Sequence, residues 1–359
     1  TYEWSPDGAK IAFLRFDESQ VPEFSMEIYD HTLYPQEDTF KYPKAGENNS
    51  VVTLHLVDVN TKKINEVDVG NPYYIPRIKW KNNPDELAVQ TINRRQDDLK
   101  LYSVNAKKNS VSLLLEETDK AYLDITDDLT FLDDDSFIWT SERDGHNHIY
   151  LYNKDGKLKN QVTSGNWEVT NYYGYDKKGD RVYYQSTENG SINRDVYSID
   201  SKGKGKVRLT DLEGTNGADF SADFTYFINA FSSATTPPIF TLYEAKTGRK
   251  LKEIKDNRSL LEKLKGYKIS PKEFSTLAIN GNNLNMWMIK PMDFDPTKKY
   301  PLLMFQYSGP GSQSVDNSWM GSNDYWYEIL ASEGYIIACV DGRGTGFKGR
   351  DFKKVTYKE

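Results

Sequence analysis

Two short polar turns carry the residues of this chain that are best placed to do chemistry. Tyr307 opens the first turn, ahead of Ser-Gly-Pro-Gly, and the second turn reads Asp-Gly-Arg-Gly at 341–344. Each turn follows an apolar run, 302–306 and 335–340, that is typical of a parallel strand buried on both faces. In open α/β sheets, ligands bind at the carboxyl ends of the strands. A phenol held at such a position can donate a hydrogen bond to the oxyanion of an acyl transfer reaction.

These residues also have simpler structural interpretations. Tyr307 could be an ordinary aromatic residue at the end of a strand. Asp341 and Arg343 could form a buried ion pair that shapes their turn, and we favour this pair over direct catalysis.

Three further polar residues have a spacing that metal ligands can use. His146 and His148 share one face of a strand, and Asp144 lies beside them. We interpret them as polar residues at the edge of a sheet, and we expect no metal and no cofactor.

The two turns belong to a predicted strand, helix, strand unit. Ser322 and Asn323 can cap a helix over 324–332, which Gly334 ends. Because the flanking strands at 302–307 and 335–340 are joined by a helix, we predict a parallel crossover.

A predicted hairpin precedes that unit. Residues 274–279 and 284–289 flank Asn280-Gly281, which is the strongest short hairpin signal in the chain. Asp256 or Asn257 can cap a short helix before it. A hairpin followed by strand, helix and strand is typical of the start of an α/β-hydrolase domain.

The first 250 residues contain a repeat. A strand of alternating pattern is closed by an acidic or amide residue every 44 to 48 residues, at Asp58, Asn105, Asn153, Asp200 and Glu244. A period of about 45 residues built from several short strands is the signature of β-propeller blades. We therefore predict a mainly β chain with five four-stranded blades over 1–255, followed by the first part of an α/β-hydrolase domain over 256–359.

The first blade contains an insertion of about 30 residues, between Arg15 and Asn49. It is charged and rich in aromatic residues, which argues against disorder. Long loops in compact domains are usually functional. A role in contacting a partner or substrate and a purely structural role both remain open.

Composition limits the remaining possibilities. The 359 residues carry 46 basic and 53 acidic side chains without a basic stripe, so we expect no nucleic-acid partner. No apolar run approaches the roughly 18 residues that a membrane span needs. The single cysteine, Cys339, cannot form a disulfide framework.

Six motifs together resemble the dipeptidyl peptidase IV members of the prolyl oligopeptidase family of serine peptidases. They lie in the same order along nearly the whole chain, at residues 4–8, 43–46, 165–169, 299–303, 307–310 and 341–344. The resemblance implies an eight-bladed propeller that caps an α/β-hydrolase domain. It implies peptide substrates with proline, or less well alanine, in the second position. It further implies a homodimer, and an extracytoplasmic location that is periplasmic or secreted. Tyr307 matches the tyrosine that completes the family's oxyanion hole.

Two features of the family are missing from these residues. The chain has no Gly-x-Ser-x-Gly nucleophile motif, which we expect beyond Glu359, with the Asp and His of the triad later still. The paired glutamates that hold the substrate's amine would lie upstream of Thr1. We therefore expect a fragment that is inactive by itself.

Two other functions stay open. One is a non-catalytic propeller that binds peptides or partners and carries a degenerate hydrolase domain. The other is an endopeptidase or acylaminoacyl peptidase of the same family.

Overall fold

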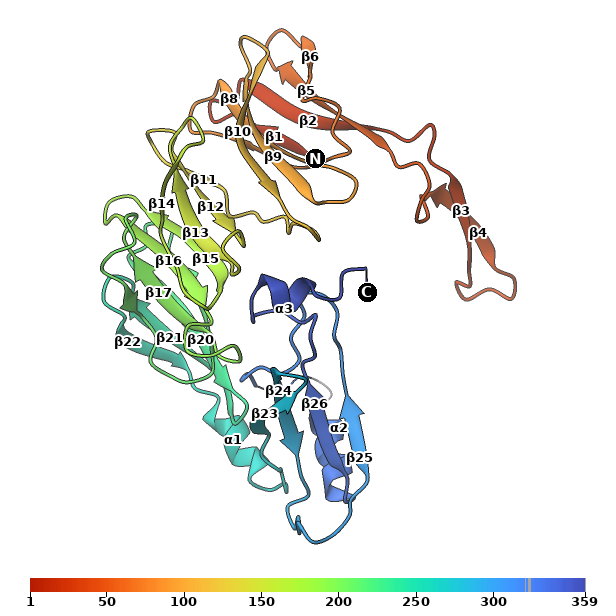
Figure 1. Cartoon of the computed structure of the whole chain (residues 1–359), viewed down its shortest axis with the longest axis vertical. Helices are drawn as coiled ribbons and strands as arrows, with labels where there is room; N and C mark the ends of the chain where they lie inside the picture. The colour runs from red at the N-terminus through yellow and green to blue at the C-terminus, as the bar shows by residue number, and fades with distance from the viewer. Residues whose placement is uncertain (320, 322–323, 359) are drawn as a thin grey trace. The chain divides into compact units, whose positions relative to one another are not determined.

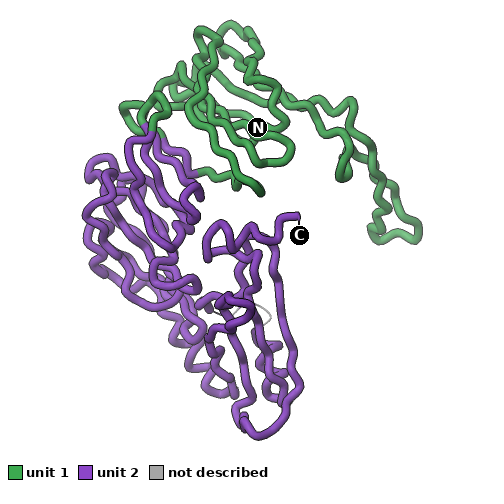
Figure 2. Tube along the Cα trace, viewed as in Figure 1, with its two compact units in different colours: residues 1–127, 131–136, 153–157 green, residues 128–130, 137–152, 158–359 purple. Residues whose placement is uncertain are grey.

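The computed structural model describes every residue except 320, 322, 323 and 359. The predicted cap at Ser322 and Asn323 therefore lies outside the described residues. The chain forms two compact units (Figure 2). Unit 1 holds residues 1–127, 131–136 and 153–157, and unit 2 holds 128–130, 137–152 and 158–359. The predicted boundary between 255 and 256 stays a prediction.

Five consecutive four-stranded antiparallel sheets confirm the predicted β-propeller blades. The first has the order β1 (Tyr2–Trp4), β2 (Lys10–Asp17), β5 (Val51–Asp58), β6 (Ile64–Val67). The second contains β7 (Tyr74–Trp80), β8 (Glu86–Ile92), β9 (Asp98–Asn105) and β10 (Ser110–Thr118). The third contains β11 (Thr130–Phe131), β12 (Phe137–Ser141), β13 (His148–Tyr152) and β14 (Leu158–Gln161).

The fourth and fifth sheets lie wholly in unit 2. They contain β15 (Val169–Asp176), β16 (Arg181–Ser186), β17 (Asp195–Ile199), β18 (Val207–Arg208), then β19 (Thr215–Phe220), β20 (Tyr226–Ser233), β21 (Thr236–Glu244) and β22 (Arg249–Lys255). Exposed and buried residues alternate along the first six positions of β20, with Phe227 and Phe231 buried. Because side chains on a strand alternate between the two faces, this pattern buries one face of β20.

The insertion in the first blade is shifted from its predicted bounds. Strand β2 continues to Asp17, which pairs with Val51, so the insertion covers 18–50 rather than Arg15 to Asn49. It forms a separate two-stranded hairpin, β3 (Glu23–Ile28) and β4 (Gln36–Lys41), that extends away from the first sheet (Figure 1).

A second type of sheet follows the blades. It has the order β23 (Glu273–Ile279), β24 (Asn282–Ile289), β26 (Ile336–Val340), β25 (Leu302–Phe305). Strands β23 and β24 form the predicted hairpin, in which Ile279 faces Asn282. Asn280 and Gly281 both have positive φ, 49° and 75°, which is the backbone that a two-residue type I′ turn requires.

The predicted crossover is present, but one prediction about it is wrong. Strands β25 and β26 are parallel and are joined through α2 (Asp324–Ser332). We predicted that residues 302–306 are buried, yet Leu302 is 61% exposed and Met304 is 53% exposed. The reason is the sheet order, which places β26 between two strands and leaves β25 at the edge.

Two short helices complete the described chain, α1 (Arg258–Leu264) and α3 (Arg350–Lys354). At the start of α1 the Asp256 carboxylate accepts the Arg258 N–H, at 3.1 Å. The Asn257 side chain makes no capping bond and instead donates to the Pro238 carbonyl. Within the described part of the chain, no helix is long and apolar enough to cross a membrane.

Candidate active-site loop

Tyr307 lies two residues beyond the end of β25, on a tight turn. Its side chain is 64% exposed, and its hydroxyl folds back over the turn. A Cβ atom at Gly309 would lie only 3.2 Å from that hydroxyl oxygen. Ser312 closes the turn, because its N–H and its hydroxyl both donate to the Gly309 carbonyl, at 3.0 and 2.6 Å. The turn therefore carries an exposed tyrosine whose hydroxyl lies close to the backbone of the same turn.

The second predicted turn holds the loop that follows Tyr307. Asp341 is buried, and its two carboxylate oxygens accept the N–H groups of Ser314 and Val315 at 3.0 and 2.9 Å. Burial raises the pKa of Asp341, and these two hydrogen bonds act in the opposite direction. The structure thus brings the two predicted turns together through residues 312–315.

The prediction of a buried ion pair between Asp341 and Arg343 is wrong. Arg343 is exposed, while Asp341 points into the protein and uses both oxygens for backbone N–H groups. A carboxylate that accepts two backbone N–H bonds has less need of a cation as its partner.

Gln313 connects the same loop to the fourth blade. Its amide nitrogen donates to the Ser191 carbonyl at 2.8 Å, and its amide oxygen accepts from the Arg194 guanidinium at 2.5 Å. Further along the loop, the Asn317 N–H donates to the Ile192 carbonyl at 2.8 Å. Sequence reasoning missed these partners, because no motif signals a contact between residues 119 positions apart.

The segment around α3 docks against polar residues of the third and fourth blades. The buried Glu168 carboxylate accepts the Gly349 N–H at 2.7 Å. Glu142 forms ion pairs with Lys353 and Lys354, at 2.5 and 3.0 Å. Burial is the largest influence on Glu168 and raises its pKa. The 165–169 motif therefore contributes a docking residue for the segment that follows the 341–344 turn.

The histidines with metal-ligand spacing have structural partners. Both ring nitrogens of the buried His148 lie within hydrogen-bond distance of polar atoms, 3.1 Å from the Thr163 hydroxyl and 2.9 Å from the Gly165 carbonyl. Burial lowers the pKa of His148, which favours the neutral ring. Among the residues that the structure describes, no group of three or more His, Cys, Asp or Glu side chains could hold a metal ion.

Comparisons with known proteins agree on one family. The family model described as "Dipeptidyl peptidase IV (DPP IV) N-terminal region" matches residues 1–238. "Dipeptidyl peptidase 4" of Trichophyton equinum is 33% identical over 377 residues, which cover 99% of this chain and 48% of that protein. "Probable dipeptidyl peptidase 4" of Arthroderma benhamiae has the same identity and the same coverage of both chains.

A solved structure gives the same result. The crystal structure of Porphyromonas gingivalis dipeptidyl peptidase 4 is similar to this chain, with a TM-score of 0.94 and 46% sequence identity, over 99% of this chain and 51% of that chain. The chain thus spans about half the length of the relatives that it matches. On the family match, the blades and the order of the motifs, the chain belongs to the dipeptidyl peptidase IV family.

Proposed function

We propose that the protein acts as a serine exopeptidase of the dipeptidyl peptidase IV type. It releases N-terminal dipeptides that have proline or alanine in the second position. The observation that carries this proposal is Tyr307, whose hydroxyl is presented by a tight turn at the carboxyl end of a parallel strand. The names of the relatives support the reaction class.

Tyr307 has the chemistry that the proposal requires of it. Attack on a peptide carbonyl builds negative charge on the carbonyl oxygen, and a preformed hydrogen-bond donor stabilises that charge. The phenol would supply one such donor. We propose that the nucleophile, the base and its orienting carboxylate belong to a longer protein, because these 359 residues contain no Gly-x-Ser-x-Gly.

The two parts of the chain have separate roles in this proposal. The five blades over 1–255 restrict access to the site, and the residues over 256–359 begin the domain that performs the acyl transfer. Paired glutamates upstream of Thr1 would hold the free amine of the peptide. A homodimer of the longer protein is part of the same proposal.

The test compares the full-length protein with residues 1–359 alone. Both are assayed with a glycyl-prolyl chromogenic substrate, with the same substrate blocked at its amino terminus, and with a serine-directed fluorophosphonate. We expect the full-length protein to cleave only the free-amine substrate and to be labelled. We expect the 359 residues alone neither to cleave the substrate nor to be labelled. Their four histidines all lie between 31 and 148, so residues 256–359 contain no histidine that could act as the base.

Each alternative gives a different result. Cleavage of the blocked substrate would favour an endopeptidase or acylaminoacyl peptidase. A full-length protein that is neither labelled nor active would favour the peptide-binding propeller. Labelling of residues 1–359 alone would mean that the nucleophile lies within them.

A further inference from the structure

We propose that Arg194, in the fourth blade, is a positioning residue that holds the Tyr307 turn through Gln313. This proposal rests on the oxyanion role proposed for Tyr307. It assigns to the propeller a direct part in orienting a catalytic group of the hydrolase domain.

The surroundings of Arg194 are unusual for a buried cation. Its side chain is only 8% exposed, and its guanidinium donates to the Ser191 and Asn193 carbonyls, at 3.0 and 2.8 Å, and to the Gln313 amide oxygen. It also stacks on the Phe347 ring, 4.2 Å from the centroid. These hydrogen-bond acceptors are all neutral.

These contacts of Arg194 fix the positions of their partners more than they stabilise the fold. Burying a charge whose hydrogen-bond acceptors are neutral costs free energy, and the through-space attraction of Asp316 and Glu168 offsets only part of it, because burial is the larger influence. An apolar side chain of similar size would fill the space at less cost. A guanidinium offers several donors in a rigid plane, so it can hold several acceptors in one fixed arrangement. Arg194 fixes two carbonyls of its own loop and one side chain of the loop that follows Tyr307.

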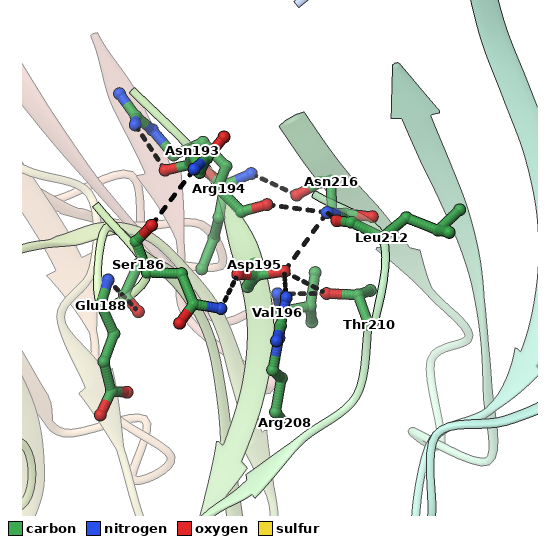
Figure 3. A network of polar contacts seen from close by, with 12 residues as sticks. Ser186, Glu188, Asn193, Arg194, Asp195, Val196, Arg208, Thr210, Leu212 and Asn216 are labelled. Atoms are coloured by element: carbon green, nitrogen blue, oxygen red, sulfur yellow. Dashed lines mark hydrogen bonds and ion pairs between the residues drawn. The ribbon is translucent and has the colours of Figure 1, made fainter. Parts of the chain in front are cut away.

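Arg194 is itself held firmly on the blade side. The Asn216 amide donates to the Arg194 carbonyl at 2.9 Å, and the same amide contacts the Asp195 carboxylate at 3.3 Å. Asp195 is 2% exposed and also accepts from Arg208 and Thr210, at 3.0 and 3.1 Å (Figure 3). This network fixes the backbone from which the Arg194 side chain extends.

The loop that contains Gln313 is also held by contacts within the residues that follow the blades. Gln313 also donates to the Val315 carbonyl at 3.1 Å, and Asp341 holds the Val315 N–H. Residues 313–315 are therefore held by hydrogen bonds from two sides, from Ser191 and Arg194 of the fourth blade and from Asp341 after the end of β26. Only the short turn between Tyr307 and Ser312 separates this anchor from β25. Because that turn carries the phenol, movement of Gln313 would change the direction of the Tyr307 hydroxyl.

The experiment uses the full-length protein and steady-state kinetics with a glycyl-prolyl chromogenic substrate. The variants are Arg194→Met, Gln313→Leu, Tyr307→Phe and the double variant Arg194→Met with Tyr307→Phe. Arg181→Met is the matched control, because that blade-four guanidinium also bonds to neutral acceptors, the Ser198 hydroxyl and the Gly205 carbonyl, each at 2.8 Å. Thermal melting of every variant reports on folding.

We expect Arg194→Met and Gln313→Leu each to lower kcat about 10- to 100-fold with little change in KM, since a displacement of about 1 Å can cost 100-fold in rate. Arg181→Met should keep the parental kcat. In the Tyr307→Phe background, Arg194→Met should lower kcat by less than about threefold further, because the group that it positions has already been removed.

Three results would overturn the proposal. The first is unchanged kcat in both Arg194→Met and Gln313→Leu while Tyr307→Phe loses turnover, which leaves the role of Tyr307 standing. The second is a full additional loss from Arg194→Met in the Tyr307→Phe background. The third is unchanged turnover in Tyr307→Phe, which removes the proposed oxyanion role and the positioning role together. If Arg194→Met does not fold, the kcat of Gln313→Leu decides the test, because that variant breaks the same contact and leaves the Arg194 side chain in place.

Discussion

The Gly349 N–H donates a hydrogen bond of 2.7 Å to the Glu168 carboxylate, across 181 positions of sequence. The contact joins the fourth-blade motif at 165–169 to the segment that leads into α3. Gly349 has a φ of 93°, a conformation that residues with a Cβ rarely adopt. A Cβ there would lie 3.0 Å from His146 Nε2 and 3.1 Å from the Gly145 carbonyl oxygen.

Gly349→Ala should therefore destabilise the protein by about 2 to 3 kcal/mol, through backbone strain and close contact together. Gly281→Ala is the comparison for a positive φ without close contact, because nothing lies within 4 Å of its added Cβ, while Gly349 also has a ψ of 160° that adds strain of its own. We expect Gly281→Ala to lose only about 1 to 2 kcal/mol. Urea unfolding followed by tryptophan fluorescence measures both losses, and equal losses would show that the contact with the blade is unimportant.

Glu168→Gln should change how stability depends on pH. Burial raises the folded-state pKa of Glu168 above its ordinary value of 4.5, so the stability associated with its neutral form is present below about pH 4.5 and is lost as the pH rises through the raised pKa. Glutamine keeps an acceptor for the Gly349 N–H but carries no charge. The variant should gain stability relative to the parent over the interval in which the pH rises from below 4.5 through the raised pKa, by about 1.4 kcal/mol for each unit of the shift.

The measurement is urea unfolding of parent and variant at several pH values in that interval. Glu142 and Lys353 lie near Glu168 and influence its pKa in opposite directions, and both remain in the variant. The difference between the two proteins therefore isolates Glu168. A difference that is constant with pH would contradict the prediction.

Asp341→Asn should weaken the loop that follows Tyr307. Asp341 accepts one N–H group on each carboxylate oxygen, from Ser314 and from Val315. In the variant the amide oxygen could accept only one of these N–H groups, and the side-chain NH₂ group would face the other N–H group. We expect a loss of about 1 to 3 kcal/mol of stability and a lower kcat. Asp351→Asn, whose parent side chain is 89% exposed, is the control and should change neither.

Tyr307→Phe should lower the turnover of the full-length protein by about 100- to 1,000-fold, which is the usual effect of removing one oxyanion donor. The side chain is 64% exposed, so its hydroxyl contributes little to folding. Substrate binding and thermal stability should stay near the parental values. Steady-state kinetics and thermal melting check both statements, and parental turnover would exclude Tyr307 from the site.

Removal of the β3–β4 hairpin should change assembly or substrate affinity. It exposes large apolar side chains, including Leu33 at 94% and Tyr34 at 82%, and Asp17 pairs with Val51 at its base, so a short turn can replace residues 19–49. Exposed apolar residues grouped on one arm are typical of an interaction surface. Sedimentation velocity and KM of the full-length protein measure the effect. If both are unchanged, the hairpin has a structural role only.

The sequence by itself determined the elements of this protein that depend on local signals. The blade period, the Asn280-Gly281 hairpin and the helix over 324–332 were all predictable, because turn residues and strand alternation act over a few positions. The family resemblance indicates that Tyr307 is an oxyanion donor, and this catalytic role stays a prediction.

Only the tertiary structure decided which elements lie beside one another. The order of the last sheet places β26 in the middle and leaves β25 exposed at the edge, which an apolar run cannot reveal. Asp341 accepts hydrogen bonds from the N–H groups of Ser314 and Val315 and does not pair with Arg343. Arg194 donates to Gln313. These contacts form only after distant segments have packed together. Burial of titratable groups such as Glu168 likewise follows from that packing and cannot be predicted from the neighbouring residues in the sequence.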